Sequence, residues 1–411
     1  MDDARDVLTA LLEDGAEYAR LRDGPFRRAL RIHPDRGIPT NWGELEPIPW
    51  SPAGRFHQAA IDPSSHLDYH TGVIWAQDAA SQVPVLLLAP QPGEIIIDVC
   101  AAPGSKTTQI GLALGASGVV VACDASDDRR AVLAETLARQ GVASAIVTPM
   151  RIEVMARRHP GAADAVLVDA PCSGHGPRKA RQVVAMARRQ AALLIDAAIL
   201  VRPGGRLVYS TCTPHRAENE DIVLGFLAAH PGWVIEPVSL PGCDADLDGL
   251  GAVRLWPHRQ GTEPFFACRL RAPGDAQATG FAGILPDPHP LADGLFPGLH
   301  IWRRGEVVLA ATALAAAVAL PADARGVLLG RVVPDGLRWE PWAVQAAIAA
   351  GAPAQTVTQE EACALWAGGT LAAALPSRSW VRTAAGAPLG QLDASGTTLV
   401  LPARMRRHSL V

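Results

Sequence analysis

Between residues 94 and 272 the sequence alternates short apolar runs with longer runs of helical periodicity. This alternation predicts a parallel, doubly wound α/β sheet, in which ligands bind beyond the carboxyl ends of the strands. Asp98, Asp124, Asp169 and Cys212 all lie at such ends. The predicted strands are residues 94–100, 118–124, 144–149, 163–171, 204–212 and 264–272, and the predicted helices are residues 104–114, 126–141, 181–201 and 218–230.

Composition limits the class of protein. The chain has 411 residues, enough for two or three domains, and its net charge of −4 excludes a polycation. Seven cysteines without a C-x-x-C spacing favour neither a disulfide framework nor a zinc site, so we predict no metal. The acidic N-terminus is unlike a signal peptide, and the longest uncharged run, from Val307, is too short to span a membrane. We predict a cytoplasmic protein without membrane contact, and a monomer.

The sequence on either side of the alternating region has a different character. Residues 1–23 have the spacing of one amphipathic helix, and Arg20–Arg36 holds six arginines, which form either a solvated basic face or a patch that follows phosphates. Residues 39–66 indicate an ordered connector, and residues 72–90 a short helix followed by a turn. After Ala272 a linker leads to a separate β-rich domain, whose last strand carries Arg404, Arg406 and Arg407.

The stretch "DVCAAPGSKTT" (98–108) joins the first predicted strand to its helix. Its small residues let a ligand approach the helix N-terminus, but it matches neither the Walker A spacing nor G-x-G-x-x-G. Such a loop suits a nucleoside cofactor without a pyrophosphate. Asp124, which ends the second strand, can accept hydrogen bonds from ribose hydroxyls, although an aspartate there is by itself more often a helix cap. Together the two features indicate S-adenosylmethionine (SAM).

Two cysteines follow neighbouring strands, Cys172 in "DAPCSG" and Cys212 in "STCT". A single cysteine in such a place is usually a small buried hydrophobic residue. Two of them at the cofactor edge of the sheet favour a chemical role. From the residues alone, either one qualifies as a nucleophile.

The motifs "DVCAAPGSKTTQ", "DAPCSGHG", "RPGGRLVYSTCT" and "ENE", in this order, resemble the Sun/Fmu-type family of RNA cytosine-C5 methyltransferases. The resemblance covers roughly residues 1–272. It implies a Rossmann-like SAM-dependent methyltransferase domain at 86–272 and an RNA-binding N-terminal segment at 1–85. Residues 273–411 more weakly resemble the PUA-like region of the members that act on 16S ribosomal RNA, which favours ribosomal RNA or the small ribosomal subunit as partner.

The resemblance also implies roles for individual residues. Cys212 attacks C6 of the cytosine, Cys172 helps to release the product, Asp169 contacts the base, and Lys106 is a candidate for the basic neighbourhood that favours a thiolate, as is Arg178. The implied cofactor-binding residues are Cys100, Ala101, Ala102, Pro103, Gly104, Ser105, Lys106, Asp124, Arg129 and Asp169.

The sequence departs from the family pattern in three places. Arg151 stands where an aspartate is expected after the third strand, the stretch after Lys179 is shorter than expected, and Pro264 replaces a glycine. Three alternatives remain beside the ribosomal RNA enzyme, and these departures favour only the second of them. They are the same chemistry on transfer RNA, an RNA-binding protein without activity, and a DNA cytosine methyltransferase, which would use Cys172 as its nucleophile.

Overall fold

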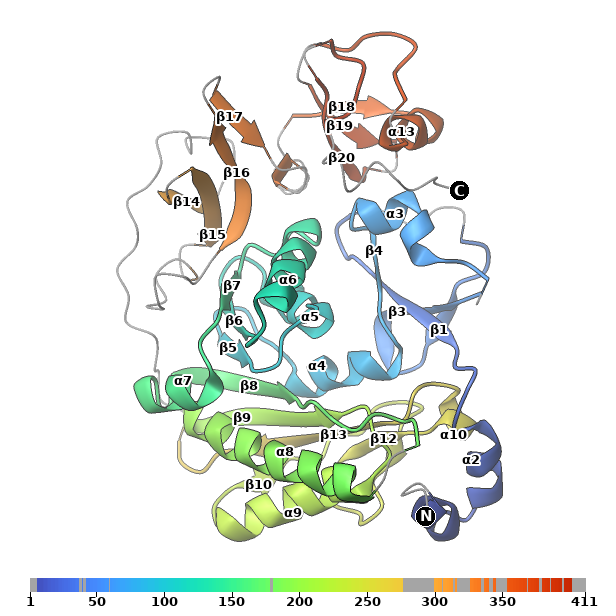
Figure 1. Ribbon diagram of the computed structural model, residues 1–411, viewed down its shortest axis with the longest axis vertical. Helices are drawn as coiled ribbons and strands as arrows, with labels where there is room; N and C mark the ends of the chain where they lie inside the picture. The colour runs from blue at the N-terminus through green and yellow to red at the C-terminus, as the bar shows by residue number, and fades with distance from the viewer. Residues whose placement is uncertain are drawn as a thin grey trace.

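The computed structural model describes an N-terminal sheet, a central α/β sheet and two small C-terminal sheets (Figure 1). It covers residues 6–400 except for 37–38, 40–41, 59, 178–179, 276–298, 305, 313–314, 316–325, 334–335, 340–342, 345–352, 368, 377–378, 385 and 394. Among the helices so described, none is long and apolar enough to cross a membrane.

Five parallel strands form the centre of the main sheet, in the order β9-β8-β5-β6-β7. They are β5 (Ile95–Asp98), β6 (Val119–Cys123), β7 (Ala145–Thr148), β8 (Ala163–Asp169) and β9 (Val201–Thr211). Beyond β9 the sheet continues with the antiparallel strands β13 (Phe265–Arg271), β12 (Val253–Leu255) and β11 (Asp244–Ala245), and β10 (Val234–Ile235) also pairs with β13. The predicted parallel α/β sheet is thus correct at its centre, and the whole sheet is mixed.

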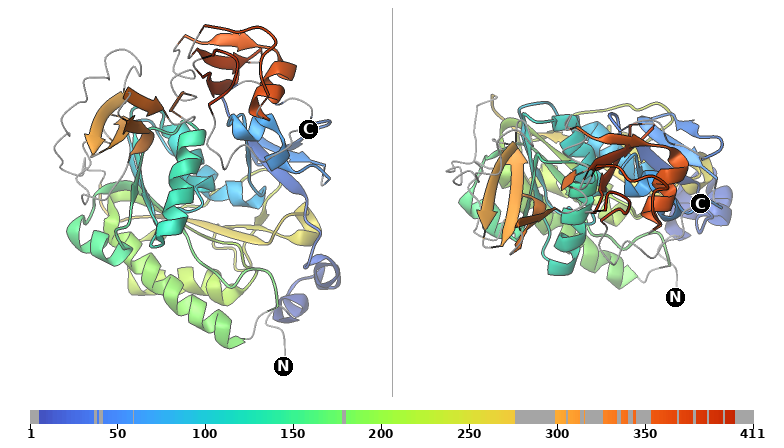
Figure 2. Two further views of the ribbon diagram at one scale, coloured as in Figure 1. Left: turned by 45° about the horizontal axis from the view of Figure 1, so that its top comes forward. Right: turned by 90° about the horizontal axis from the view of Figure 1, so that it is seen from above.

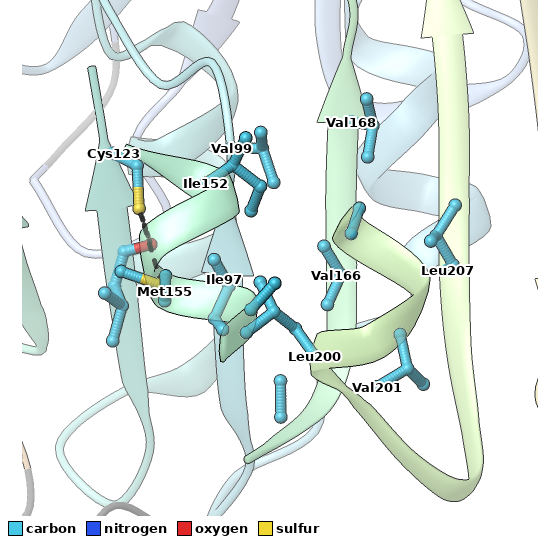
Figure 3. Close-up of a cluster of buried hydrophobic side chains, with 14 of the residues drawn as sticks. Ile97, Val99, Cys123, Ile152, Met155, Val166, Val168, Leu200, Val201 and Leu207 are labelled. Atoms are coloured by element: carbon cyan, nitrogen blue, oxygen red, sulfur yellow. Dashed lines mark hydrogen bonds between the residues drawn. The ribbon is translucent and has the colours of Figure 1, made fainter. Parts of the chain in front are cut away.

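Helices cover both faces of this sheet (Figures 1 and 2). Because neighbouring residues of a strand point to opposite faces, Ile97 packs with one set of helices and Ile96 with the other. The first set is α7 (Ile152–Arg158), α8 (Ala180–Leu200) and α9 (Glu220–Ala229), and the second is α4 (Val83–Leu88), α5 (Ser105–Leu114) and α6 (Asp127–Arg139). Figure 3 shows Ile152 and Met155 of α7 packed against Cys123 and Ile97.

The N-terminal region contains a sheet that the sequence did not predict. Two helices, α1 (Asp6–Leu11) and α2 (Gly15–Leu21), replace the single predicted one. The expected connector contains β2 (Glu46–Ile48) and β3 (Ser51–His57), which pair with β1 (Arg28–Ile32), and β4 (Ile74–Ala76) lies where a helix was predicted. The helix predicted there begins later, as η2 (Ala80–Gln82) followed by α4. Trp50 and Phe56 bury their rings in the core beneath α4, so tertiary packing stabilises strands with little periodicity of their own.

The arginine-rich segment divides between surface and interior. Arg27 and Arg28 are exposed, whereas Arg31 and Arg36 are only 4% and 1% exposed. Arg31 donates to the Gln77 side chain at 2.8 Å and to the carbonyl oxygen at the start of α5 at 3.0 Å. Burial lowers the pKa of Arg31 to about 9. A solvated basic face is therefore wrong for Arg31 and Arg36, whose side chains are buried against α5 and α6.

The described C-terminal residues form two sheets. The first contains β14 (Leu299–Arg304), β15 (Val307–Thr312), β16 (Val327–Val333) and β17 (Gly336–Trp339), and the second contains β18 (Gln355–Val357), β19 (Trp380–Thr383) and β20 (Pro388–Gln391), with α13 (Gln359–Trp366) beside it. The β-rich character is confirmed. These sheets are not isolated, since Leu309 joins the core of the central sheet and the Trp366 ring lies 5.1 Å from that of His70. Arg404, Arg406 and Arg407 lie outside the described residues.

Candidate active site

The two cysteines meet at the carboxyl edge of the central sheet. Cys172 lies in the turn after β8, and Cys212 directly follows β9, the neighbouring parallel strand. Their sulfur atoms are 3.1 Å apart, within hydrogen-bonding distance. Both side chains are only partly buried, and Cys212 also packs against the hydrophobic core. The structure therefore brings together the two residues that the sequence singled out.

The contact between the sulfurs couples their ionisation. A thiol that donates to a neighbouring thiolate stabilises that thiolate, so the pair loses its first proton more easily than a lone thiol does and its second proton less easily. In the arrangement seen, the hydrogen bond from Cys212 lowers the pKa of Cys172, and the same bond raises the pKa of Cys212. Either sulfur can be the donor, so transfer of one proton across the contact exchanges which sulfur is the thiolate.

Lys106 and Asp169 form an ion pair beside the sulfurs. The Lys106 Nζ lies 2.7 Å from Asp169 Oδ2, and it also donates to Ser81 Oγ at 3.0 Å. The Ser210 hydroxyl, two residues before Cys212 on β9, donates to Asp169 Oδ1 at 2.8 Å. Burial alone lowers the pKa of Lys106, but Asp169 and the other anionic groups nearby reverse this effect and raise it. Lys106 therefore carries a fixed positive charge near the cysteines.

The predicted cofactor loop joins β5 to α5. Ala101 and Ala102 are buried, Pro103 is exposed, and Cys100 is partly buried, with burial raising its pKa to about 12. Gly104 has a φ of +110° at the N-terminus of α5, and no side chain caps that helix. The amide groups of the first turn, which begins at Ser105, can therefore face a polar ligand.

The second half of the cofactor site follows β6. The Asp124 side chain is 4% exposed, and its Oδ2 lies 3.3 Å from the guanidinium of Arg129. Arg129 also donates to the carbonyl oxygen of Ala102 at 2.6 Å, so it connects the two loops. A carboxylate that accepts from hydroxyls and an uncapped helix terminus are the groups that the ribose and the amino-acid part of SAM need. The residues present thus fit this cofactor.

Several residues of the site were not predicted from the sequence. Ser210 had a detectable signal, since residues two apart in a strand share a face with Cys212. Ser81 comes from η2, far from the strand ends, and no local pattern indicates it. Glu218 and Asn219 were interpreted as the start of a helix, but α9 begins at Glu220, and these two residues are fully buried beside the cysteines.

Other predicted positions lie apart from the cysteines or outside the described residues. Arg151 precedes α7, with its side chain 73% exposed and paired with Glu153 at 2.5 Å. Arg178 and Lys179 lie outside the described residues. The part of the chain that the structure describes groups no three His, Cys, Asp or Glu side chains that could hold a metal ion.

Comparison with known proteins identifies the family of the chain. Residues 85–271 match the family model of the 16S rRNA methyltransferases RsmB/F. The chain is 33% identical to ribosomal RNA small subunit methyltransferase F of Klebsiella pneumoniae, over 82% of this chain and 80% of that protein. The chain belongs to the RsmB/F family. It is also 33% identical to a tRNA (cytosine(49)-C(5))-methyltransferase of Pyrococcus abyssi, over 64% of this chain and 93% of that one.

Solved structures agree with this assignment. A methyltransferase homolog protein from Pyrococcus horikoshii superposes with a TM-score of 0.58 at 26% identity, over 64% of this chain and 93% of that one. NSun6 from the same organism, crystallised with SFG, has the same fold, with a TM-score of 0.60 at 21% identity over 67% of this chain and 99% of that one. As a member of the RsmB/F family, the chain is an RNA cytosine-C5 methyltransferase with SAM as its cofactor, so the predicted family, activity and cofactor are confirmed.

Proposed function

We propose that the chain methylates a cytosine of 16S ribosomal RNA with Cys212 as nucleophile and Cys172 as the residue that assists release. The observation that carries this proposal is the 3.1 Å contact of the two sulfurs beside the Lys106–Asp169 pair. Once the shared proton resides on Cys172, Cys212 is a thiolate. The positive charge of Lys106 favours that form.

The reaction then divides into two easier steps. The Cys212 thiolate adds to C6 of the cytosine, and the electron pair displaced by the new S–C6 bond makes C5 nucleophilic. SAM supplies an electrophilic methyl group, which C5 takes. The C5 proton then passes to solvent water, and the electron pair of the C5–H bond restores the C5–C6 double bond. The S–C6 bond breaks with its electron pair on the Cys212 sulfur, and Cys172 assists by donating a hydrogen bond to this departing thiolate. Asp169, held by Lys106 and Ser210, contacts the base.

The cofactor is held by the two loops. Under this proposal the residues from Cys100 to Lys106 contact SAM through their backbone, and the Asp124 carboxylate accepts from its ribose hydroxyls. Arg129 fixes the distance between the loops. Residues 86–272 form the catalytic domain, residues 1–85 bind RNA, and residues 273–411 are a PUA-like second RNA-binding region. The protein acts as a cytoplasmic monomer.

Transfer RNA is a second candidate substrate, because one relative at 33% identity is a tRNA methyltransferase. That match covers 64% of this chain, whereas the match to the small-subunit enzyme covers 82%. The longer match favours ribosomal RNA.

The test uses purified protein with radiolabelled SAM and, separately, small ribosomal subunits, naked 16S RNA and transfer RNA. We expect label in ribosomal RNA, and label only in transfer RNA would refute the substrate assignment. Cys212→Ala should abolish transfer, and Cys172→Ala should leave a covalent RNA–protein adduct that survives denaturing gels. The reverse behaviour of the two variants would refute the assigned roles. Bisulfite sequencing of cellular RNA with and without the gene then locates the cytosine.

A further inference from the structure

Glu218 and Gln190 hold the turn that carries Cys172 on both sides of the cysteine. Glu218 is fully buried, and its carboxylate accepts from the Ser173 amide at 3.0 Å and from the Ser173 hydroxyl. Gln190 of α8, also fully buried, donates to Glu218 Oε2 at 2.7 Å and to the Pro171 carbonyl oxygen at 2.9 Å. The residues immediately before and after Cys172 are thus bound to one polar pair.

Asn219, the next residue along the chain, makes the equivalent contacts around Cys212. Its Oδ1 accepts from the Thr211 hydroxyl at 2.5 Å, and its Nδ2 donates to the Thr213 carbonyl oxygen at 2.9 Å. Asn219 is fully buried as well. The two turns also touch directly, since the hydroxyls of Ser173 and Thr213 are 3.3 Å apart.

We propose that Glu218 and Asn219 are positioning residues, Glu218 for Cys172 and Asn219 for Cys212, which together set the separation of the two sulfurs. Neither residue is expected to touch the substrate, because each acts through the backbone and hydroxyl groups that flank a cysteine. Consecutive residues share a peptide bond, so the distance between their two sets of contacts is covalently limited. The assignment of each residue to one step of the reaction rests on the roles proposed above for the cysteines.

The chemistry of these contacts indicates which substitutions disturb the turn of only one of the two cysteines. Three donor groups point at the Glu218 carboxylate, and a glutamine in its place would remove the negative charge that they share, with its amide nitrogen able to donate only to the Ser173 hydroxyl. Glu218→Gln therefore loosens the Cys172 turn while keeping the shape of the side chain. Asn219→Ala removes both contacts around Cys212. Ser173→Ala and Thr211→Val each delete one hydroxyl of one turn and are milder alternatives if the first pair of variants fails to fold.

The experiment compares each variant in two backgrounds, with naked 16S RNA and labelled SAM. In the otherwise unchanged chain, both Glu218→Gln and Asn219→Ala should lower kcat by about 10- to 100-fold with little change in KM for SAM, as a misplaced catalytic group does. In the Cys172→Ala background the readout is the rate of adduct formation. There Asn219→Ala should slow it by a similar factor, whereas Glu218→Gln should change it by less than about twofold, because the cysteine it positions is gone.

Glu236→Gln is the matched control. Glu236 pairs with Arg269 and Arg271 on β13, away from the cysteines, so the same substitution there should leave kcat unchanged. Equal slowing of adduct formation by Glu218→Gln and Asn219→Ala in the Cys172→Ala background would overturn the proposal, as would full activity of both variants. An adduct formed by Cys212→Ala, and not by Cys172→Ala, would instead refute the roles of the cysteines. The pairing would then be tested in the Cys212→Ala background, where Asn219→Ala should be silent.

Discussion

The buried ion pair between Glu220 and Arg254 gives the sharpest stability prediction. Both side chains are 0% exposed, and the guanidinium donates to the two carboxylate oxygens at 2.8 and 2.6 Å. Arg254 also donates to the Pro214 carbonyl oxygen at 3.1 Å, two residues after Cys212. Because arginine stays charged in proteins, Glu220→Gln leaves a buried cation without its counter-charge. We expect the free energy of unfolding to fall by about 3–5 kcal/mol.

Two further variants separate this effect from the general cost of the substitution. Glu236→Gln breaks an ion pair whose carboxylate side chain is 34% exposed, and it should cost less than about 1 kcal/mol because solvent screens the charges. Glu220→Leu combined with Arg254→Met removes both charges. This double variant should recover part of the stability lost in Glu220→Gln, because about 1–3 kcal/mol remains lost for the Pro214 carbonyl and the Leu247 amide left without partners.

Urea unfolding followed by far-ultraviolet circular dichroism measures all of these variants. The reasoning fails if Glu220→Gln costs no more than Glu236→Gln, since burial would then not amplify the loss of the counter-charge. It also fails if the double variant is less stable than Glu220→Gln, because the penalty would then come from lost packing and not from the unpaired charge.

Three other predictions concern the cofactor edge. Lys106→Met should lower kcat by about 100-fold and slow adduct formation by the same factor, because the ion pair with Asp169 and the positive charge beside the cysteines are lost together. Labelled SAM measures kcat, and single-turnover gels measure adduct formation. Burial raises the pKa of Asp98 from 3.8 to about 7, so the folded protein holds this proton more tightly than the unfolded chain and loses stability as pH rises between those values. Asp98→Asn should therefore be more stable than the unchanged chain in urea at pH 8 and not at pH 4. Gly104→Ala should weaken SAM binding about tenfold by calorimetry, because φ is +110° and the new Cβ would lie 2.9 Å from a side chain of α6. Gly115 also has a positive φ, but open space surrounds it, so Gly115→Ala should leave SAM binding unchanged and serves as the control.

The strand and helix pattern was sufficient to predict the five parallel strands at the centre of the main sheet and the residues at their carboxyl edge. The apolar residues 95–97 and Val119–Cys123 are buried on both faces of the sheet, so these sequences are continuously hydrophobic and easy to recognise. Because parallel strands end at one edge, Cys172, Cys212 and Asp169 had to lie near one another once the strands were assigned. The sulfur–sulfur contact itself follows from the turns and not from the strands.

The N-terminal sheet was not predictable for a physical reason. Strand β2 has only three residues, and both β2 and β3 contain a proline, which is unusual inside a strand. The burial of Arg31 and Arg36 could not be predicted for a related reason. Arg31 differs from the exposed Arg28 only in the neighbours that the fold supplies, namely the Gln77 side chain and the first turn of α5.

The polar network beneath the cysteines was not predicted from the sequence, because its contacts also depend on neighbours that only the fold supplies. This network suits a site that needs fixed geometry. Ser173, Thr213, Glu218 and Asn219 are each at most 7% exposed. A buried polar group that loses its partner costs about 1–3 kcal/mol, so each member stabilises only the one arrangement that satisfies all the others. An apolar core could repack around a shifted turn, whereas this network cannot without leaving donors unpaired. The fixed distance between Cys172 and Cys212 is thus a consequence of where the buried hydrogen bonds are, and not of the two cysteines themselves.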